Sequence, residues 1–171
     1  MTNILTLKDE AETEAYVYFD SQIRKLSRTS TGEIDRTAFG LADNDVDAFR
    51  HAYTSGVYTM VYNERLAEIF GILQEISGGN SSGAGGAAAA RNMDLWNNAV
   101  GRKYGKKTRL RDELAKSIHA ALNNGELITI TSDPRKYEGK TDYVVDPNKP
   151  VITADESATG RNELFIDLLT W

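Results

Sequence analysis

The sequence predicts a mainly helical α+β domain, and two patterns carry that prediction. Residues 46–76 contain no proline and place apolar side chains at helical spacing. Residues 110–122 carry a leucine or isoleucine at every fourth position. With 171 residues, the chain has the size of one domain. We therefore expect a single domain over residues 1–171, with a compact helical core from about residue 8 to residue 125 and a small β-hairpin appendage near the C-terminus.

The N-terminal part is predicted to contain two helical regions separated by a loop. Residues 8–28 carry apolar side chains close to helical spacing. Residues 30–45 are rich in Ser, Gly, Thr and Asp, which indicates a loop, and Asp45 is well placed to cap the next helix. Residues 46–76 then form one long central helix or a kinked pair, for which Gly56 and Gly71 are the candidate bends.

The C-terminal part is predicted to begin with a flexible, glycine-rich loop over residues 77–90, whose alanine-rich end can start a helix. Residues 93–105 are helical in character and end at Gly105. The helix over 110–122 ends at the Asn124-Gly125 pair. Beyond this helix, in residues 126–171, we predict short strands at 126–131, 143–145 and 151–153 and a closing helix at 163–169.

The composition excludes several kinds of site. The chain has no cysteine and only two histidines, which excludes disulfides, thiolate chemistry and a three-histidine zinc site. No run of apolar residues is long enough to span a membrane. The net charge of −5 argues against a dedicated nucleic-acid binder. We expect no cofactor and no metal, since helix capping explains the acidic cluster at 43–47 more simply than a cation site does.

The first candidate for chemistry is the pair Asp47 and His51 in the segment DAFRHAY, which also contains Arg50. A spacing of four residues puts the carboxylate and the imidazole on one helix face, where Asp47 can orient His51 or raise its pKa. Such a pair is half of a catalytic relay. The alternative is a structural histidine that hydrogen-bonds a neighbour on an amphipathic helix.

The second candidate is a polar set in MDLWNNAVGR, formed by Asp94, Asn97, Asn98 and Arg102. Adjacent asparagines are unfavourable inside a helix because their side chains compete for backbone hydrogen bonds. Their presence indicates that the amides are needed, either to bind a polar ligand or to hold the 31–45 loop or the central helix in place.

The third candidate is Glu75, at the end of the apolar central helix and directly before the glycine-rich loop. Desolvation by apolar neighbours such as Ile72 and Ile76 favours the protonated carboxyl group, as a general acid requires. The alternative is an exposed glutamate in the last helical turn, followed by a linker.

A basic run follows at residues 101–111 and surrounds Tyr104. This run could contact an anionic polymer or a nucleic acid. The alternative is a solvated helix junction in which Arg102 points inward.

Two resemblances follow from these motifs. DAFRHAY and MDLWNNAVGR resemble the pattern DAxRHA followed by MDLxNNxxGR, which belongs to a poorly characterised bacterial domain family of toxin-like effectors and phage-derived loci; the match covers residues 43–105. Members commonly show a His-Glu pair before the loop, where this chain has Gln74-Glu75. QEISGGNSSGAGG is similar to the signature of lytic transglycosylases and lysozyme-like glucosaminidases, with Ile76 inserted after the glutamate. This similarity implies a lysozyme-like domain with Glu75 as the catalytic acid.

The leading functional hypothesis is a peptidoglycan glycan-strand hydrolase of the lysozyme, glucosaminidase or lytic transglycosylase type, acting as an antibacterial effector or a phage lysis factor. Glu75 would be the general acid, and Asp47 or Asp94 would stabilise the developing positive charge. Asn97, Asn98, Arg102 and Tyr104 are the candidates for substrate binding. One alternative is a hydrolase centred on Asp47 and His51 that acts on nucleic acid or lipid. The other is a non-enzymatic structural or interaction module.

The expected partners follow from the leading hypothesis. They are peptidoglycan glycan strands and a cognate immunity protein, while nucleic acid is not expected. The N-terminus shows neither a basic nor an apolar segment typical of a signal peptide. We therefore expect synthesis in the cytoplasm and export by a dedicated secretion system or a holin, with action in the periplasm of the target cell.

Overall fold

The computed structural model describes residues 4–38, 40–77 and 84–139, without the side chains of residues 73–77, 84 and 85. Within these ranges the chain forms five helices: α1 (Ile4–Gln22), α2 (Asp45–Val61), α3 (Glu64–Ser77), α4 (Ala84–Gly105) and α5 (Arg111–Asn123). The mainly helical fold class is therefore confirmed. The predicted β-hairpin, the strands at 143–145 and 151–153, and the closing helix at 163–169 lie outside the described residues. No helix of the described ranges is long and apolar enough to cross a membrane.

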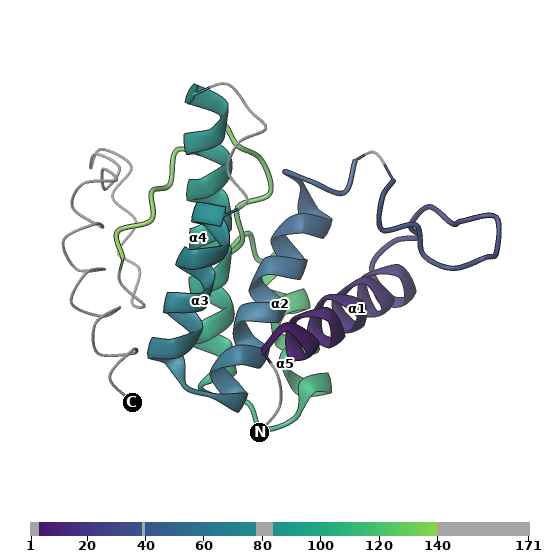
Figure 1. Ribbon diagram of the computed structural model, residues 1–171, viewed down its shortest axis with the longest axis horizontal. Coiled ribbons are helices and arrows are strands. Elements are labelled where there is room, and N and C mark those ends of the chain that lie inside the picture. The colour runs from purple at the N-terminus through teal and green to yellow at the C-terminus, as the bar shows by residue number, and fades with distance from the viewer. Residues whose placement is uncertain (1–3, 39, 78–83, 140–171) are drawn as a thin grey trace.

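Helix α2 is the centre of the fold, because it contacts each of the other four helices. Figure 1 shows α1 crossing α2 obliquely, while α3 and α4 run more nearly along it. The α2 side chains of Phe49, Ala52 and Val57 are fully buried, as is Met93 of α4. Complete burial of one large apolar side chain contributes about 2 kcal/mol. The candidate site described below stands on α2 and α4, the two helices that pack most extensively against each other.

Helices α2 and α4 pack backbone against backbone through glycines. A Cβ atom on Gly101 of α4 would collide with the backbone carbonyl group of Ala52 in α2, and one on Gly105 would collide with the carbonyl oxygen of Gly56. Only residues without a side chain allow this approach. The close packing brings the polar side chains of the two helices within hydrogen-bond distance of one another.

The predicted central helix is divided, but not at either candidate glycine. The break lies at Tyr62 and Asn63, where the side chain of Asn63 accepts a hydrogen bond from the backbone N–H of Leu66 at 3.0 Å and so starts α3. Gly56 and Gly71 remain helical. Both lie where α4 comes close: a Cβ atom on Gly56 would be 3.0 Å from the Gly101 carbonyl oxygen, and one on Gly71 would be 3.1 Å from the Asn98 amide nitrogen.

The helix ends also differ from the prediction. Helices α1 and α4 begin earlier than predicted, at Ile4 and Ala84, so the second half of the predicted 77–90 loop is helical. Asn44, not Asp45, caps α2, because the Asn44 side chain accepts from the backbone N–H groups of Val46 and Asp47. Asp45 pairs instead with Arg24, at 2.7 Å. Helix α1 ends at Gln22 rather than near residue 28, since the Asp20 carboxylate accepts from the backbone N–H of Leu26 at 2.8 Å and stabilises a turn there.

The strand predicted at 126–131 is wrong, because the chain there has no strand partner among the described residues. Side-chain amides of α4 take the place of a neighbouring strand. Asn97 donates to the carbonyl oxygen of Ile128 at 2.8 Å and accepts from its N–H at 2.9 Å. Asn92 likewise donates to the carbonyl oxygen of Arg135 and accepts from the N–H of Tyr137, each at 2.9 Å. Two asparagines thus hold residues 128–137 against the helix.

Candidate active site

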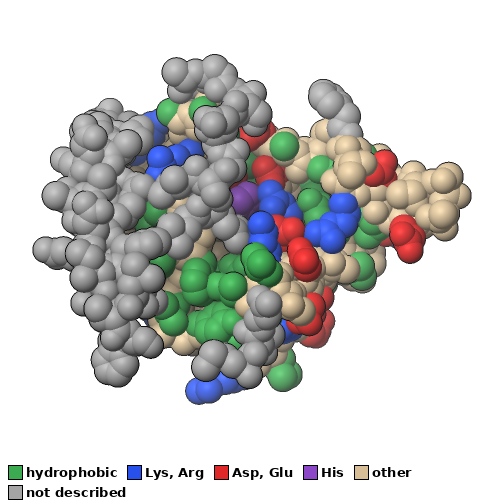
Figure 2. Space-filling view, in the orientation of Figure 1, with side chains coloured by type: hydrophobic (Ala, Val, Ile, Leu, Met, Phe, Trp, Pro, Cys, Tyr) green, Lys and Arg blue, Asp and Glu red, His purple; other side chains and the backbone are tan. Residues whose placement is uncertain are grey.

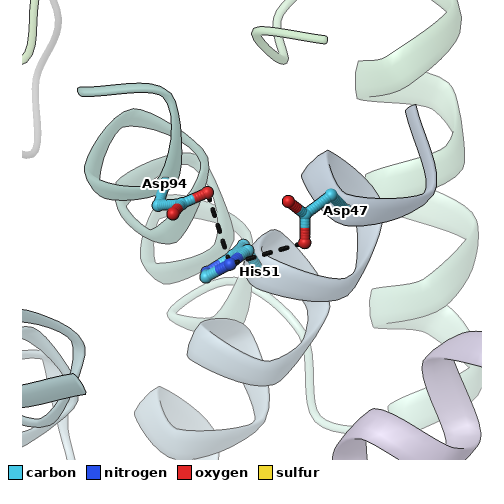
Figure 3. A group of neighbouring side chains, drawn as sticks. All are labelled: Asp47, His51 and Asp94. Atoms are coloured by element: carbon cyan, nitrogen blue, oxygen red, sulfur yellow. Dashed lines mark ion pairs between the residues drawn. The ribbon is translucent and has the colours of Figure 1, made fainter. Parts of the chain in front are cut away.

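The site is built on facing turns of α2 and α4. Helix α2 contributes Asp47, Arg50 and His51, and helix α4 contributes Asp94 and Asn98. Spacings of three or four residues put each set on one face of its helix. Figure 3 shows the ring of His51 between the carboxylates of Asp47 and Asp94. The two sequence motifs, DAFRHAY and MDLWNNAVGR, therefore meet in one place.

The imidazole of His51 lies between two carboxylates. Its Nε2 atom lies 3.6 Å from Oδ1 of Asp47 and 3.3 Å from Oδ1 of Asp94. One nitrogen or oxygen atom from each of the three residues lies within 4.8 Å of the other two. Asp47 is buried and Asp94 is partly exposed, at 6% and 15% of the side chain. Asp94 is thus the carboxylate more open to a substrate.

Arg50 ties this group to α1. One of its terminal nitrogens, Nη2, contacts Nε2 of His51 at 2.9 Å and forms an ion pair with Asp47. The other, Nη1, pairs with Glu12 of α1 at 3.1 Å. Because a guanidinium only donates hydrogen bonds, Nε2 accepts and Nδ1 of His51 carries the proton. Nδ1 then donates to the amide oxygen of Asn98 at 3.3 Å.

Burial controls the charge of His51. Desolvation, followed by the nearby Arg50 guanidinium, lowers the pKa of His51 to about 4, against the opposing effect of Asp47. The ring is therefore neutral at pH 7. Burial raises the pKa of Asp47, but Arg50 and His51 outweigh it and hold that pKa below its usual value. The site at neutral pH combines a neutral imidazole, an ionised Asp47 and a charged Arg50.

A small polar pocket lies beside His51. Its volume is about 10 Å³, roughly the space of one water molecule. The lining residues are Glu12, Arg50, His51, Thr54, Ser55, Tyr58, Gly71 and Asn98. The hydroxyl groups of Thr54 and Ser55 are buried and have no hydrogen-bond partner in the described part of the chain. Since buried hydroxyls ordinarily have partners, these two are suited to a water or a polar group of a ligand.

The surface around the site is mixed in charge. Figure 2 shows basic and acidic side chains lying beside one another on one face of the molecule. Asp47, His51 and Asp94 are residue types that bind divalent cations. Arg50 already supplies a positive charge between His51 and Asp47. The absence of a metal stays a prediction.

Three of the predicted substrate-binding residues have structural partners away from the pocket. Asn97 is fully buried, and both ends of its amide bond Ile128. The Arg102 side chain, 1% exposed, donates to Tyr137 at 3.1 Å and pairs with Glu68 at 3.4 Å. The hydroxyl of Tyr104 donates to Glu126 at 2.8 Å. Of the four predicted substrate-binding residues, Asn98 is the one that contacts His51. The burial of Arg102 agrees with the alternative in which its side chain points inward.

Glu75 lies on α3, in the helical turn after Gly71. Its side chain is outside the described residues, so its predicted role as the acid stays a prediction.

The basic run at 101–111 is largely neutralised within the fold. Lys103 pairs with Glu126 at 3.0 Å, Lys106 with Glu64 at 2.7 Å, and Arg111 with Glu14 at 2.6 Å. Together with the buried Arg102, four cations of the run are matched to carboxylates inside the chain. This arrangement resembles the predicted helix junction more than a surface for anionic polymers.

The sequence patterns missed part of the pocket. Thr54 and Tyr58 follow His51 by three and seven residues, so helical spacing could have placed them on its face. Glu12 comes from α1, and no local pattern connects it with the two motifs.

The comparison with known families confirms the predicted membership of an uncharacterised domain family, while the link to toxin-like effectors and to lysozyme-like enzymes stays a prediction. Residues 10–126 match the family described as a domain of unknown function, DUF6973, and the chain belongs to this family. The match includes both motifs and all residues of the His51 site. No curated protein and no solved structure matches the chain.

Proposed function

We propose that the chain is a hydrolase whose acid–base centre is His51, flanked by Asp47 and Asp94. The observation that carries the proposal is the position of His51 Nε2 between two carboxylate oxygens from different helices, beside a polar pocket. A purely structural histidine needs only one hydrogen-bond partner per ring nitrogen. Two carboxylates at one nitrogen instead stabilise the protonated ring that forms when a base takes up a proton.

The roles follow from the contacts. Asp47 and Arg50 orient the ring, and Arg50 is itself anchored by Glu12. The neutral ring takes a proton at Nε2 from a water molecule that attacks the substrate. Before this step Nε2 accepts a hydrogen bond from Arg50. Once protonated, Nε2 instead donates to Oδ1 of Asp94, which lies 3.3 Å away. Asn98 holds Nδ1 and thereby fixes which nitrogen reacts.

The substrate to test first is the glycan strand of peptidoglycan, with the protein acting as an antibacterial effector or a lysis factor. Pairing of Lys103, Lys106 and Arg111 with carboxylates reduces the positive charge that the basic run offers to nucleic acid. A glycan strand requires no such positive charge. In this reading a cognate immunity protein covers the His51 pocket, and a dedicated secretion system or a holin gives access to the target periplasm.

The experiment is a substrate comparison with purified protein. Isolated sacculi, single-stranded RNA and phospholipid vesicles are incubated with the wild type and with Asp94→Asn, which keeps the shape of the side chain and removes its charge. We expect soluble muropeptides from sacculi, reduced at least tenfold in Asp94→Asn. Cleavage of RNA or vesicles instead of sacculi would contradict the proposed glycan substrate but would still support His51 as the acid–base centre. No cleavage of any of the three would favour the non-enzymatic module.

A further inference from the structure

Helices α3 and α4 pack in a constant antiparallel register. Glu64 of α3 pairs with Lys106 of α4 at 2.7 Å. One turn further along α3, Glu68 contacts Arg102 at 3.4 Å. One more turn along, a Cβ atom on Gly71 would lie 3.1 Å from the amide nitrogen of Asn98. Each step of three or four residues forward on α3 thus matches a step of four backward on α4.

The same register can be continued by one turn. Four residues after Gly71 comes residue 75, still within α3, and four residues before Asn98 comes Asp94. A helix repeats its face every three or four residues. The backbone of residue 75 therefore lies on the face of α3 that packs against α4, at the level of Asp94. Gly71 already lines the His51 pocket, one turn away.

We propose that Glu75 is the second acid–base group of the His51 centre, so that the two carboxylates of this level, Glu75 and Asp94, act in one site. The inference rests on the proposed hydrolase function for its chemistry and on the helix register for its placement. It joins two predictions that the sequence leaves separate, Glu75 as the acid and His51 as the base. The exposed-glutamate alternative requires residue 75 to leave the face that Glu64, Glu68 and Gly71 define.

The proton balance of this arrangement is closed. The oxygen of a water molecule forms a bond to the substrate while its proton passes to Nε2 of His51. The bond to the leaving oxygen breaks, and that oxygen takes the proton of the Glu75 carboxyl group. The imidazolium afterwards loses its proton, and the Glu75 carboxylate regains one from solvent.

A cysteine pair tests the placement without any assay of activity. The chain contains no cysteine, so Glu75→Cys combined with Asp94→Cys gives the only thiol pair. We expect this pair to form an intramolecular disulfide under mild oxidation, because disulfides join Cα atoms about 4.4–6.8 Å apart. Glu68→Cys with Asp94→Cys is the matched control on the same face of α3, about 10 Å further along the helix axis, and should stay reduced. Circular dichroism of each reduced double variant confirms that it is folded. A reduced 75/94 pair in a folded protein would overturn the inference.

The role of Glu75 is tested separately with Glu75→Gln. We expect at least a hundredfold loss of kcat on the polymer that the wild type cleaves, together with loss of the alkaline limb of the pH–rate profile, because glutamine cannot supply a proton. Wild-type kcat and an unchanged profile would overturn the inference even if the cysteine pair forms a disulfide. If the disulfide forms but the wild type cleaves nothing, the proposed function fails, and with it the acid–base role of Glu75, while the register of residue 75 beside Asp94 stands.

Discussion

The Nε2 atom of His51 on α2 lies 3.3 Å from a carboxylate oxygen of Asp94 on α4. These residues belong to two motifs that are far apart in the sequence, and the glycine-mediated packing of α2 on α4 brings them together. The same helix packing that stabilises the fold therefore also positions the side chains of the site. A change in the helix packing is therefore expected to affect both.

The first prediction concerns the close approach of Gly101 to Ala52. Gly101→Ala places a Cβ atom into the Ala52 carbonyl group, so the two helices must separate. We expect a loss of about 3 kcal/mol or more in the free energy of unfolding, measured by urea denaturation. Gly125→Ala is the control: Gly125 has a φ of +71° with open space around its Cα, so backbone strain alone should cost about 1 kcal/mol. Equal effects of the two changes would contradict the packing account.

The second prediction separates the two adjacent asparagines. Asn97→Ala leaves the buried N–H and carbonyl oxygen of Ile128 without partners, which should cost about 2 kcal/mol or more in stability. Asn98→Ala should cost less stability but lower the rate of hydrolysis, because it frees Nδ1 of His51. Urea denaturation and rates measured on the folded fraction check both. A binding role for Asn97 would instead appear as a raised KM at unchanged stability.

The third prediction is a dependence of stability on pH. The pKa of His51 is lowered from 6.5 to about 4 in the folded protein, so the unfolded chain binds the proton more readily. The stability from this group is complete above pH 6.5 and is lost as the pH falls toward 4, by about 3 kcal/mol. His51→Gln should remove that part of the pH dependence. The comparison is the difference in unfolding free energy between wild type and His51→Gln at pH 7 and at pH 4; an unchanged difference would show that His51 titrates normally.

The fourth prediction concerns the charge next to the ring. Arg50 lowers the pKa of His51, second only to burial, so Arg50→Gln should raise that pKa. The NMR signals of the ring, followed through a titration, report it directly. Arg36→Gln is a matched control: Arg36 pairs with the same Glu12 at 3.1 Å, whereas Arg50 also contacts Nε2 of His51. An equal shift in both variants would mean that Arg50 acts only through Glu12.

Local sequence patterns predicted most of the helices and the side chains that α2 and α4 contribute to the site. Asp47 with His51, and Asp94 with Asn98, lie four residues apart, and such spacing determines a shared helix face without knowledge of the tertiary structure. The ends of α4 at Gly105 and of α5 at Asn123 were likewise predicted from local residues, the glycine and the Asn-Gly pair.

The features that the sequence did not predict depend on tertiary contacts. Gly56 and Gly71 were expected to bend the central helix, but their missing side chains serve the packing on α4. The strand expected at 126–131 had suitable composition, yet its backbone is paired by the amide of Asn97 instead. Glu12 reaches the pocket only because α1 crosses α2. No spacing along the chain encodes these contacts.

The most direct test of the central claim compares the two histidines of the chain. His51→Gln removes the base of the site, whereas His119→Gln changes a histidine on α5 that contacts Tyr18 at 3.4 Å. With both variants folded by circular dichroism, the rate of muropeptide release from sacculi is measured at pH 7. We predict a loss of about 10²–10⁴-fold for His51→Gln and a rate close to wild type for His119→Gln. Equal rates for His51→Gln and the wild type would contradict a His51-centred hydrolase.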